Sequence, residues 1–176
     1  MKNIEILCRE AKIASHLLAT VEGEKKNKFL LNLAEWLLAQ QDRITSENAR
    51  DIAQGRASGL SDALIDRLTL TPARIEGMAN DLQHVSNLQD PVGEIFERST
   101  TPHGLKVRKQ RVPLGVLAVI YESRPNVTID IAVLALKTGN AVILRGGSET
   151  LRSNIALVDV IRAALVEADL PVDAVQ

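Results

Sequence analysis

Apolar residues recur every three or four positions through the first half of the chain, with polar residues between them. This spacing predicts helices that each bury one face. Ser46 has the side chain of an N-cap residue, and Thr71 followed by Pro72 marks a clearer helix start. The predicted helices span residues 3–20, 24–42, 46–57, 62–68 and 72–86.

The helical pattern stops at DPVG, residues 90–93, and apolar and charged residues then alternate along two short segments. TPHG joins these segments, so the stretch 95–111 predicts a β-hairpin. Its second segment carries the positive residues Lys106, Arg108, Lys109 and Arg111. Because they alternate with apolar residues, a solvated face or charged strand edge is favoured over a nucleic-acid patch. An exposed ribbon of this kind also suits contact between two copies of the chain.

Nearly continuous apolar runs in the second half predict neighbouring parallel strands, the first of them buried on both faces. Gly139 supplies the tight turn before the second strand. The connecting helix is expected to pack through Ile131, Leu134, Ala135 and Leu136, and the last helix through Ile155, Val158, Ile161, Ala164 and Leu165. LPVDAVQ then begins a third strand. The fold class is therefore α/β, with a helical layer, a β-hairpin and the start of a parallel Rossmann-like sheet. The predicted order is strand 112–120, helix 127–138, strand 141–145 and helix 151–168.

The turn Arg145-Gly146-Gly147-Ser148 has the composition of an anion site. Two glycines let the backbone approach a phosphate, and Ser148 or Thr150 can cap the next helix, whose first amides favour an anion. Arg145 adds a permanent positive charge. An ordinary strand-to-helix turn with a surface arginine explains the same residues equally well. The GxGxxG fingerprint and the P-loop are both absent, so a site here does not use the standard Rossmann grip.

Composition narrows the functional classes. Hydrophobic residues make up 45% of the chain and charged residues 24%, which is typical of a globular protein. The net charge of −1 and the aromatic content of 2% argue against nucleic-acid binding. No apolar run approaches the roughly 20 residues of a membrane span, and charges interrupt the N-terminus, so the cytoplasm is the expected compartment. One cysteine and dispersed histidines predict no disulfide within the chain and no metal site.

Three chemically versatile side chains have structural interpretations. Cys8 is expected to be a small core or boundary residue, since nothing nearby in the sequence lowers the pKa of its thiol. His84 lies beside an apolar helix face and is interpreted as a satisfied structural histidine. Trp36 is interpreted as a core residue rather than a platform for a ligand.

The strings PLGV, GNAVILRGGSE and LPVDAVQ together resemble the aldehyde dehydrogenase superfamily. The longer string RVPLGVLAVIYESRPNVT, with GLSDALIDRLTLTPARIEGMA and LQDPVGE upstream, is similar to one of its families, the gamma-glutamyl phosphate reductases. The resemblance covers essentially the whole chain. It implies NADPH-dependent reduction of L-glutamyl 5-phosphate to L-glutamate 5-semialdehyde and phosphate, in proline biosynthesis, through a cysteine thioester.

The resemblance also implies a division of the chain. Residues 1–93 are similar to the helical part of the cofactor domain, 94–112 to an oligomerisation hairpin, and 113–176 to the first βαβ part of the NADP-binding domain. The family's catalytic cysteine belongs to a later segment and Cys8 does not match it, so this chain alone is expected to be inactive. A non-catalytic nucleotide-binding module and a helical assembly domain are the alternative interpretations.

The same resemblance assigns roles to individual residues. The superfamily position of Arg145 commonly carries a lysine that holds the adenosine ribose, and the position of Ser148 a glutamate in NAD-preferring members. A glutamate there would repel a 2′-phosphate, so the pair found here implies NADP(H). Arg124 and Asn126 are candidates for substrate contact, although Arg124 paired with Glu122 is the structural alternative. Superfamily members often have an asparagine near this turn that donates to an oxyanion, and either Asn126 or Glu122 stands at that position. The expected cofactor-binding residues are Ile120, Tyr121, Glu122, Arg145, Gly146, Gly147 and Ser148.

Overall fold

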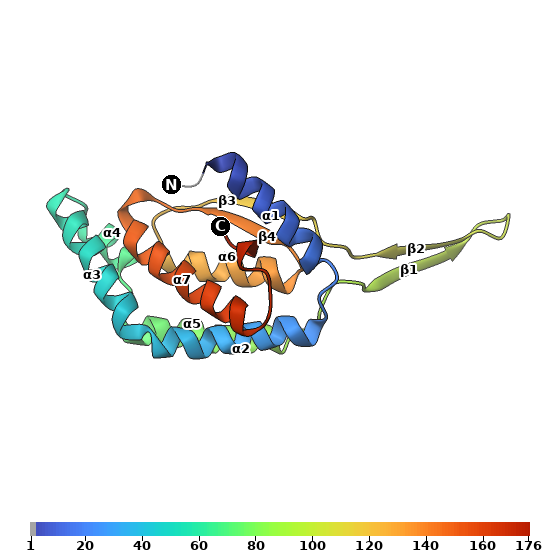
Figure 1. Ribbon diagram of the computed structural model, residues 1–176, viewed down its shortest axis with the longest axis horizontal. Helices are drawn as coiled ribbons and strands as arrows, with labels where there is room; N and C mark the ends of the chain where they lie inside the picture. Colours follow the sequence, from blue (N-terminus) through green and yellow to red (C-terminus); the bar gives the residue numbers. More distant parts are fainter. Residues whose placement is uncertain (1–2) are drawn as a thin grey trace.

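The computed structural model describes residues 3–176 as a layered α/β arrangement (Figure 1). Helix α1 lies on one face of a short parallel sheet, α6 and α7 lie on the other, and α2 and α5 form a further layer beyond them. The first helices are α1 (Ile4–Leu18), α2 (Gly23–Ala39), α3 (Gln41–Ala57), α4 (Asp62–Leu68) and α5 (Pro72–Ser86). The later elements are β1 (Ile95–Thr100), β2 (Lys106–Gln110), β3 (Val116–Ile120), α6 (Pro125–Lys137), β4 (Ala141–Arg145), η1 (Ser148–Thr150), α7 (Leu151–Glu167) and η2 (Val172–Ala174).

Local signals explain several helix ends, although not all of them. Thr71 caps α5 by accepting a hydrogen bond from the Arg74 amide at 3.2 Å. The predicted helix start at Ser46 is wrong, because α3 already begins at Gln41. A single corner residue, Gln40, separates α2 from α3. Neither glycine nor proline marks this corner in the sequence, so the pattern of apolar residues alone could not locate it.

The parallel sheet is built around β4. β3 pairs with β4 along its whole length, and Val175 forms a parallel bridge with Val142 on the other side, so the predicted third strand begins there. The prediction that residues 112–120 are buried on both faces is wrong. Side chains of β3 alternate between partly buried and exposed near its end, and Ile120 is 84% exposed. This alternation shows that β3, an edge strand within residues 3–176, is packed mainly from one side.

The core is aliphatic and joins residues of both halves of the chain. On α6 the buried stripe runs through Ile129, Val133 and Leu136, one or two helical turns apart. Leu134 falls outside this stripe and is 55% exposed, and Ile155 on α7 is 54% exposed, so the prediction is wrong at these two positions. The other predicted packing residues that are buried are Ala135, Leu136, Ile161, Ala164 and Leu165. An apolar run does not by itself say which side of a helix faces the core.

Buried charges fasten the start of the hairpin to the helices. Lys26 is 1% exposed, and its Nζ lies 2.6 Å from Asp90 Oδ2. Lys137 is also buried and donates to Asn27 Oδ1 at 2.6 Å and to the Ser86 carbonyl at 3.2 Å. Burial lowers the pKa of Lys137, and the negative charge of Asp90 opposes that change. The two ammonium groups therefore join α2, α6 and the segment that leads into β1.

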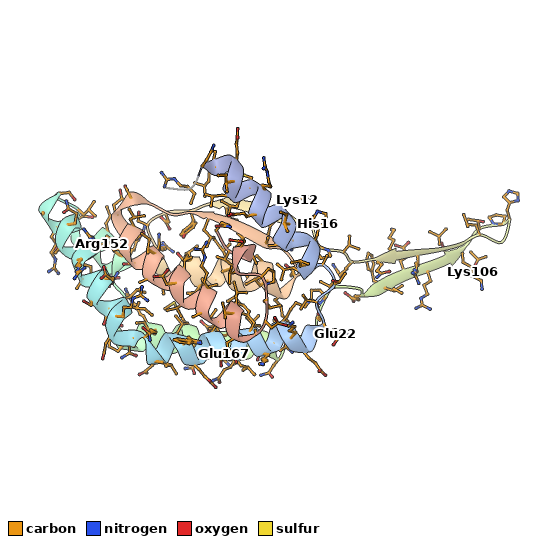
Figure 2. The ribbon with its side chains drawn as sticks, viewed as in Figure 1. Lys12, His16, Glu22, Lys106, Arg152 and Glu167 are labelled. Carbon is orange, nitrogen blue, oxygen red and sulfur yellow. The ribbon has the colours of Figure 1, made fainter. Side chains whose placement is uncertain are left out.

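The hairpin β1–β2 projects far from the body of the molecule as an isolated ribbon (Figure 1). Lys106 lies well out along it (Figure 2). Glu97 and Lys109 form an ion pair across the strands at 2.5 Å, whereas Arg98 stands opposite Arg108. Nearly all of the ribbon's side chains are exposed, which confirms the predicted charged and solvated hairpin.

Candidate functional site

The turn between β4 and α7 is the first candidate site. Arg145 is exposed, and its Nη1 donates a hydrogen bond to the carbonyl of Gly146. A Cβ added to Gly146 would lie 2.4 Å from Asn154 Nδ2, and one added to Gly147 would lie 1.8 Å from Ser123 Oγ. The buried Asn154 side chain therefore restricts position 146 to glycine, whereas a side chain at position 147 would require Ser123 and Glu149 to move.

A chain of hydrogen bonds, each side chain donating to the next, runs from Tyr121 to the carbonyl of Gly147 in this turn. Tyr121 Oη lies 2.7 Å from Thr128 Oγ1, and Thr128 donates to Asn154 Oδ1 at 2.9 Å. Because the single Thr128 proton is used there, Tyr121 must be the donor to Thr128. Asn154 then donates to Thr150 Oγ1 at 3.2 Å, and Thr150 to the Gly147 carbonyl at 3.4 Å. Burial raises the pKa of Tyr121, which keeps this first donor protonated.

A distant carboxylate caps the N-terminus of α7. Asp51 on α3 is 5% exposed and accepts hydrogen bonds from Ser153 N at 2.8 Å and Ser153 Oγ at 2.7 Å, with Arg152 N further away at 3.4 Å. Figure 2 shows Arg152 where the start of α7 meets α3. The expectation that Ser148 or Thr150 caps this helix is wrong, since neither side chain makes a capping bond. The Ser153 amide therefore already has an anionic partner, and the Asp51 carboxylate adds a negative charge at the start of α7 that disfavours a ligand phosphate there.

An open cavity of about 520 Å³ lies beside the turn. Two of its charged residues are engaged: Asp159 pairs with Arg43 at 2.5 Å, and Arg162 donates to Gln176 Oε1 at 2.9 Å. The hydrogen bond of Arg145 instead goes to its neighbour's carbonyl, which leaves its charge facing solvent at the cavity. The aliphatic lining consists of Leu144, Leu151, Ile155 and Val158.

The structure separates the predicted cofactor residues into two groups. Ile120 is exposed and, with Glu122, lies outside the lining of this cavity. Glu122 instead lines a cavity of about 280 Å³ together with Ser123 and Glu149. Ser123 donates to Glu149, and this hydrogen bond lowers the pKa of Glu149 most strongly. The predicted residues that do line the larger cavity are Tyr121, Arg145, Gly146, Gly147 and Ser148.

The predicted substrate residues lie in a third place. Arg124 and Asn126 line a cavity of about 390 Å³ between α4, α5 and the start of α6. Arg124 Nε lies 2.7 Å from Glu122 Oε1, so the structural pairing considered from the sequence is present. Asn126 donates to Asp130 Oδ2 at 3.2 Å. Neither residue lines the cavity beside Arg145.

The versatile side chains lie apart from these cavities. Cys8 is exposed on α1 rather than part of the core. The His84 side chain is 82% exposed, with Nδ1 4.0 Å from Asp81, so it is a surface residue. Trp36 packs against the core, as predicted, and donates to Glu167 at 2.7 Å. Within residues 3–176 no group of three or more metal-ligating side chains occurs, and no helix there is long and apolar enough to cross a membrane.

Sequence reasoning missed the polar residues that support the glycine turn. Asp51, Thr128 and Asn154 are buried or nearly so. Thr128 and its partner Asn154 are 26 positions apart, and Asp51 and its partner Ser153 are 102 positions apart, so no local motif records these pairs. The one signal in the sequence is a polar residue at a position where the helical spacing predicts a buried side chain. That signal does not identify the residue with which the polar side chain forms its hydrogen bond.

The model of the Aldehyde dehydrogenase family matches residues 1–176, and the chain belongs to this family. Among curated proteins it is similar to the gamma-glutamyl phosphate reductases of Pasteurella multocida (strain Pm70), at 53% identity over 174 residues, and of Escherichia coli (strain SMS-3-5 / SECEC), at 54% over 166 residues. These matches cover 99% and 94% of this chain but 41% and 40% of the relatives. The chain thus spans about two fifths of their length.

Solved structures of proteins with the same name as these relatives are also similar to this chain. The crystal structure of the gamma-glutamyl phosphate reductase from Thermotoga maritima matches with a TM-score of 0.95 and 38% identity, over 99% of this chain and 42% of that one. The enzyme of that name from Saccharomyces cerevisiae matches with a TM-score of 0.93 and 31% identity, over 100% of this chain and 46% of that one. The aldehyde dehydrogenase type of α/β fold predicted from the sequence is therefore confirmed.

Proposed function

We propose that this chain carries the cofactor-binding part of an enzyme that reduces L-glutamyl 5-phosphate to L-glutamate 5-semialdehyde and phosphate with NADPH, in the proline biosynthesis of the cytoplasm. Relatives named gamma-glutamyl phosphate reductase, 53% and 54% identical, support this assignment. The observation that carries the cofactor choice is the exposed Arg145 guanidinium at a cavity that also has an aliphatic wall of Leu144, Leu151, Ile155 and Val158.

The residues beside Arg145 fit NADP(H). Aliphatic side chains suit a planar adenine ring, and a guanidinium suits the 2′-phosphate that distinguishes NADP from NAD. Ser148 adds a hydroxyl without negative charge. Asp51 occupies the Ser153 amide and places a negative charge at the start of α7, so the recognition of a phosphate here falls to Arg145. When bound, the nicotinamide supplies the hydride.

The chain contributes binding and orientation rather than the nucleophile. Cys8, its one cysteine, lines none of the cavities beside Arg145, Glu122 or Arg124. We place the acyl-accepting thiolate elsewhere in the longer proteins that this chain resembles. The hydrogen-bond chain from Tyr121 keeps the glycine turn in place, and a fixed turn orients a bound cofactor.

We also propose that residues 1–93 and 113–176 form one cofactor-binding unit and that 94–112 is an assembly element. Helices α1, α2, α3 and α5 share a single core with β4, α6 and α7, which supports the first part. An isolated two-stranded hairpin is marginal in water, and this one projects without cover from other elements, which supports self-association through it.

The cofactor proposal is tested by Arg145→Ala in the full-length protein. Loss of a charge-assisted phosphate contact of about 1.5–3 kcal/mol is expected to raise the Kd for NADPH roughly 10- to 100-fold and to leave NADH binding nearly unchanged. Ser148→Glu should shift preference toward NADH by repelling the 2′-phosphate. Arg152→Ala, at a neighbouring exposed arginine outside the cavity lining, is the matched control. Equal losses for NADPH and NADH would contradict the proposal.

A further inference from the structure

The cavity of about 390 Å³ between α4, α5 and α6 is lined by charges of both signs. Arg67 and Arg124 lie close together because both approach the Glu122 carboxylate, and the charge of Asp81 acts on Asp130. The lining therefore holds a pair of arginines and a pair of aspartates. Leu70 and Met78 add apolar surface. The volume lies within the range of small-molecule sites. None of its residues is used by the cofactor cavity beside Arg145.

Arg67 and Arg124 together carry more positive charge than the Glu122 carboxylate between them neutralises. Glu122 Oε1 lies 2.7 Å from Arg124 Nε, and Glu122 Oε2 lies 3.9 Å from Arg67 Nη1. Two guanidinium groups thus share one carboxylate. The Arg124 Nε atom is shielded from solvent and, despite the nearby carboxylate, has no acceptor in hydrogen-bond geometry. A ligand carboxylate here would meet an uncompensated cation.

A third arginine belongs to the cavity wall. Arg74 donates to the Asp66 side chain at 3.0 Å and to the Thr69 carbonyl at 2.7 Å. These bonds tie the end of α4 to the start of α5. Arg74 and Asp66 therefore neutralise one another, and the polarity of the cavity comes from its remaining charged residues.

The two aspartates of the lining, Asp81 and Asp130, have little positive charge nearby. Asp81 on α5 and Asp130 on α6 both line the cavity, and Asp130 accepts only a neutral hydrogen bond, from Asn126. The nearest cationic candidate, His84 Nδ1, lies 4.0 Å from Asp81. Partial burial raises the pKa of Asp130 and the charge of Asp81 raises it further, whereas the Asn126 bond opposes both. An ammonium group placed between the two carboxylates would relieve their repulsion.

We propose that this cavity recognises the α-amino acid end of the substrate, with its carboxylate at Arg67 and Arg124 and its ammonium at Asp81 and Asp130. This inference rests on the proposed function, because it names the part of the substrate that this cavity takes. It also explains why Arg124 and Asn126 lie apart from the cofactor cavity. The residues near Arg145 hold the cofactor, and those of α4, α5 and α6 select an amino acid.

The test compares three probes by calorimetric titration of the full-length protein. L-glutamate carries both charged groups, glutarate lacks the ammonium, and 4-aminobutyrate lacks the α-carboxylate. We expect wild type to prefer L-glutamate over both. Asp130→Asn should weaken L-glutamate binding about tenfold or more and leave glutarate unchanged, and Arg67→Ala should weaken both. Asp81→Asn provides a second variant in case Asp130→Asn does not fold.

Exposed residues on the same stretch supply the controls. Asp62→Asn and Arg56→Ala lie outside the cavity and should leave all three affinities unchanged. Glutarate binding as tightly as L-glutamate, or no L-glutamate binding at all, overturns the inference. NADPH is titrated into the same samples. Normal NADPH discrimination by Arg145 without amino-acid discrimination refutes this inference alone, and the reverse result refutes the cofactor proposal alone.

Discussion

Replacing Asp51 with alanine should destabilise the fold although the residue lies far along the chain from the helix that it caps. Its carboxylate accepts two short hydrogen bonds, at 2.8 Å and 2.7 Å, from the Ser153 amide and hydroxyl. The Arg152 contact at 3.4 Å is too long to count. At about 1.5 kcal/mol for each bond to a charged group, the loss is about 3 kcal/mol. Two buried donors at the start of α7 would be left without an acceptor.

Urea unfolding followed by far-UV circular dichroism measures this loss. For an m-value of about 2 kcal/mol/M, the midpoint should fall by roughly 1.5 M. Asp51→Asn keeps one acceptor oxygen and should lose about half as much. Gln54→Ala, at an exposed position of the same helix, is the control and should change stability by less than about 0.5 kcal/mol.

A double-mutant cycle separates this contact from a general defect of α3. Ser153→Ala removes the hydroxyl that donates a hydrogen bond to Asp51. The losses of unfolding free energy in the two single variants should therefore sum to more than the loss in the double variant. An Asp51→Ala midpoint within error of wild type, or full additivity with Ser153→Ala, would refute the argument. Because α7 carries the turn beside Arg145, the Asp51 variant should also bind NADPH more weakly.

Two further predictions concern the hairpin. Asp90→Asn should lower stability by about 3 kcal/mol in urea unfolding, because it leaves the Lys26 ammonium, which is 1% exposed, without its counter-charge. Adding Lys26→Met should recover much of the loss, and an Asp90→Asn variant as stable as wild type argues against a role for the pair. Replacing residues 96–109 with a short glycine linker should abolish self-association in sedimentation velocity while helix content persists. Oligomers of unchanged size would exclude the hairpin as the contact.

Local order was predictable because it depends on neighbours along the chain. The spacing of apolar residues located the helices, the switch to alternation located the hairpin, and Thr71 with Pro72 marked a helix start correctly. Gly139 has φ of 74°, as its predicted left-handed turn requires. The composition of the turn predicted a candidate anion site, and Arg145, Gly146, Gly147 and Ser148 do line the cavity of about 520 Å³.

Tertiary structure decided which of these residues meet. It placed Asp51 at the start of α7, joined Tyr121 to the glycine turn, and put Arg124 in a different cavity from Arg145. It also left Leu134 exposed within an apolar run. Periodicity specifies that a helix has an apolar face, but the direction of that face and the partner of each polar group depend on the packing of elements distant in the chain. Local sequence patterns therefore indicate most of the elements and the composition of the turn, whereas the packing of distant elements sets how these residues divide between the cavity beside Arg145 and the cavity that Arg124 lines.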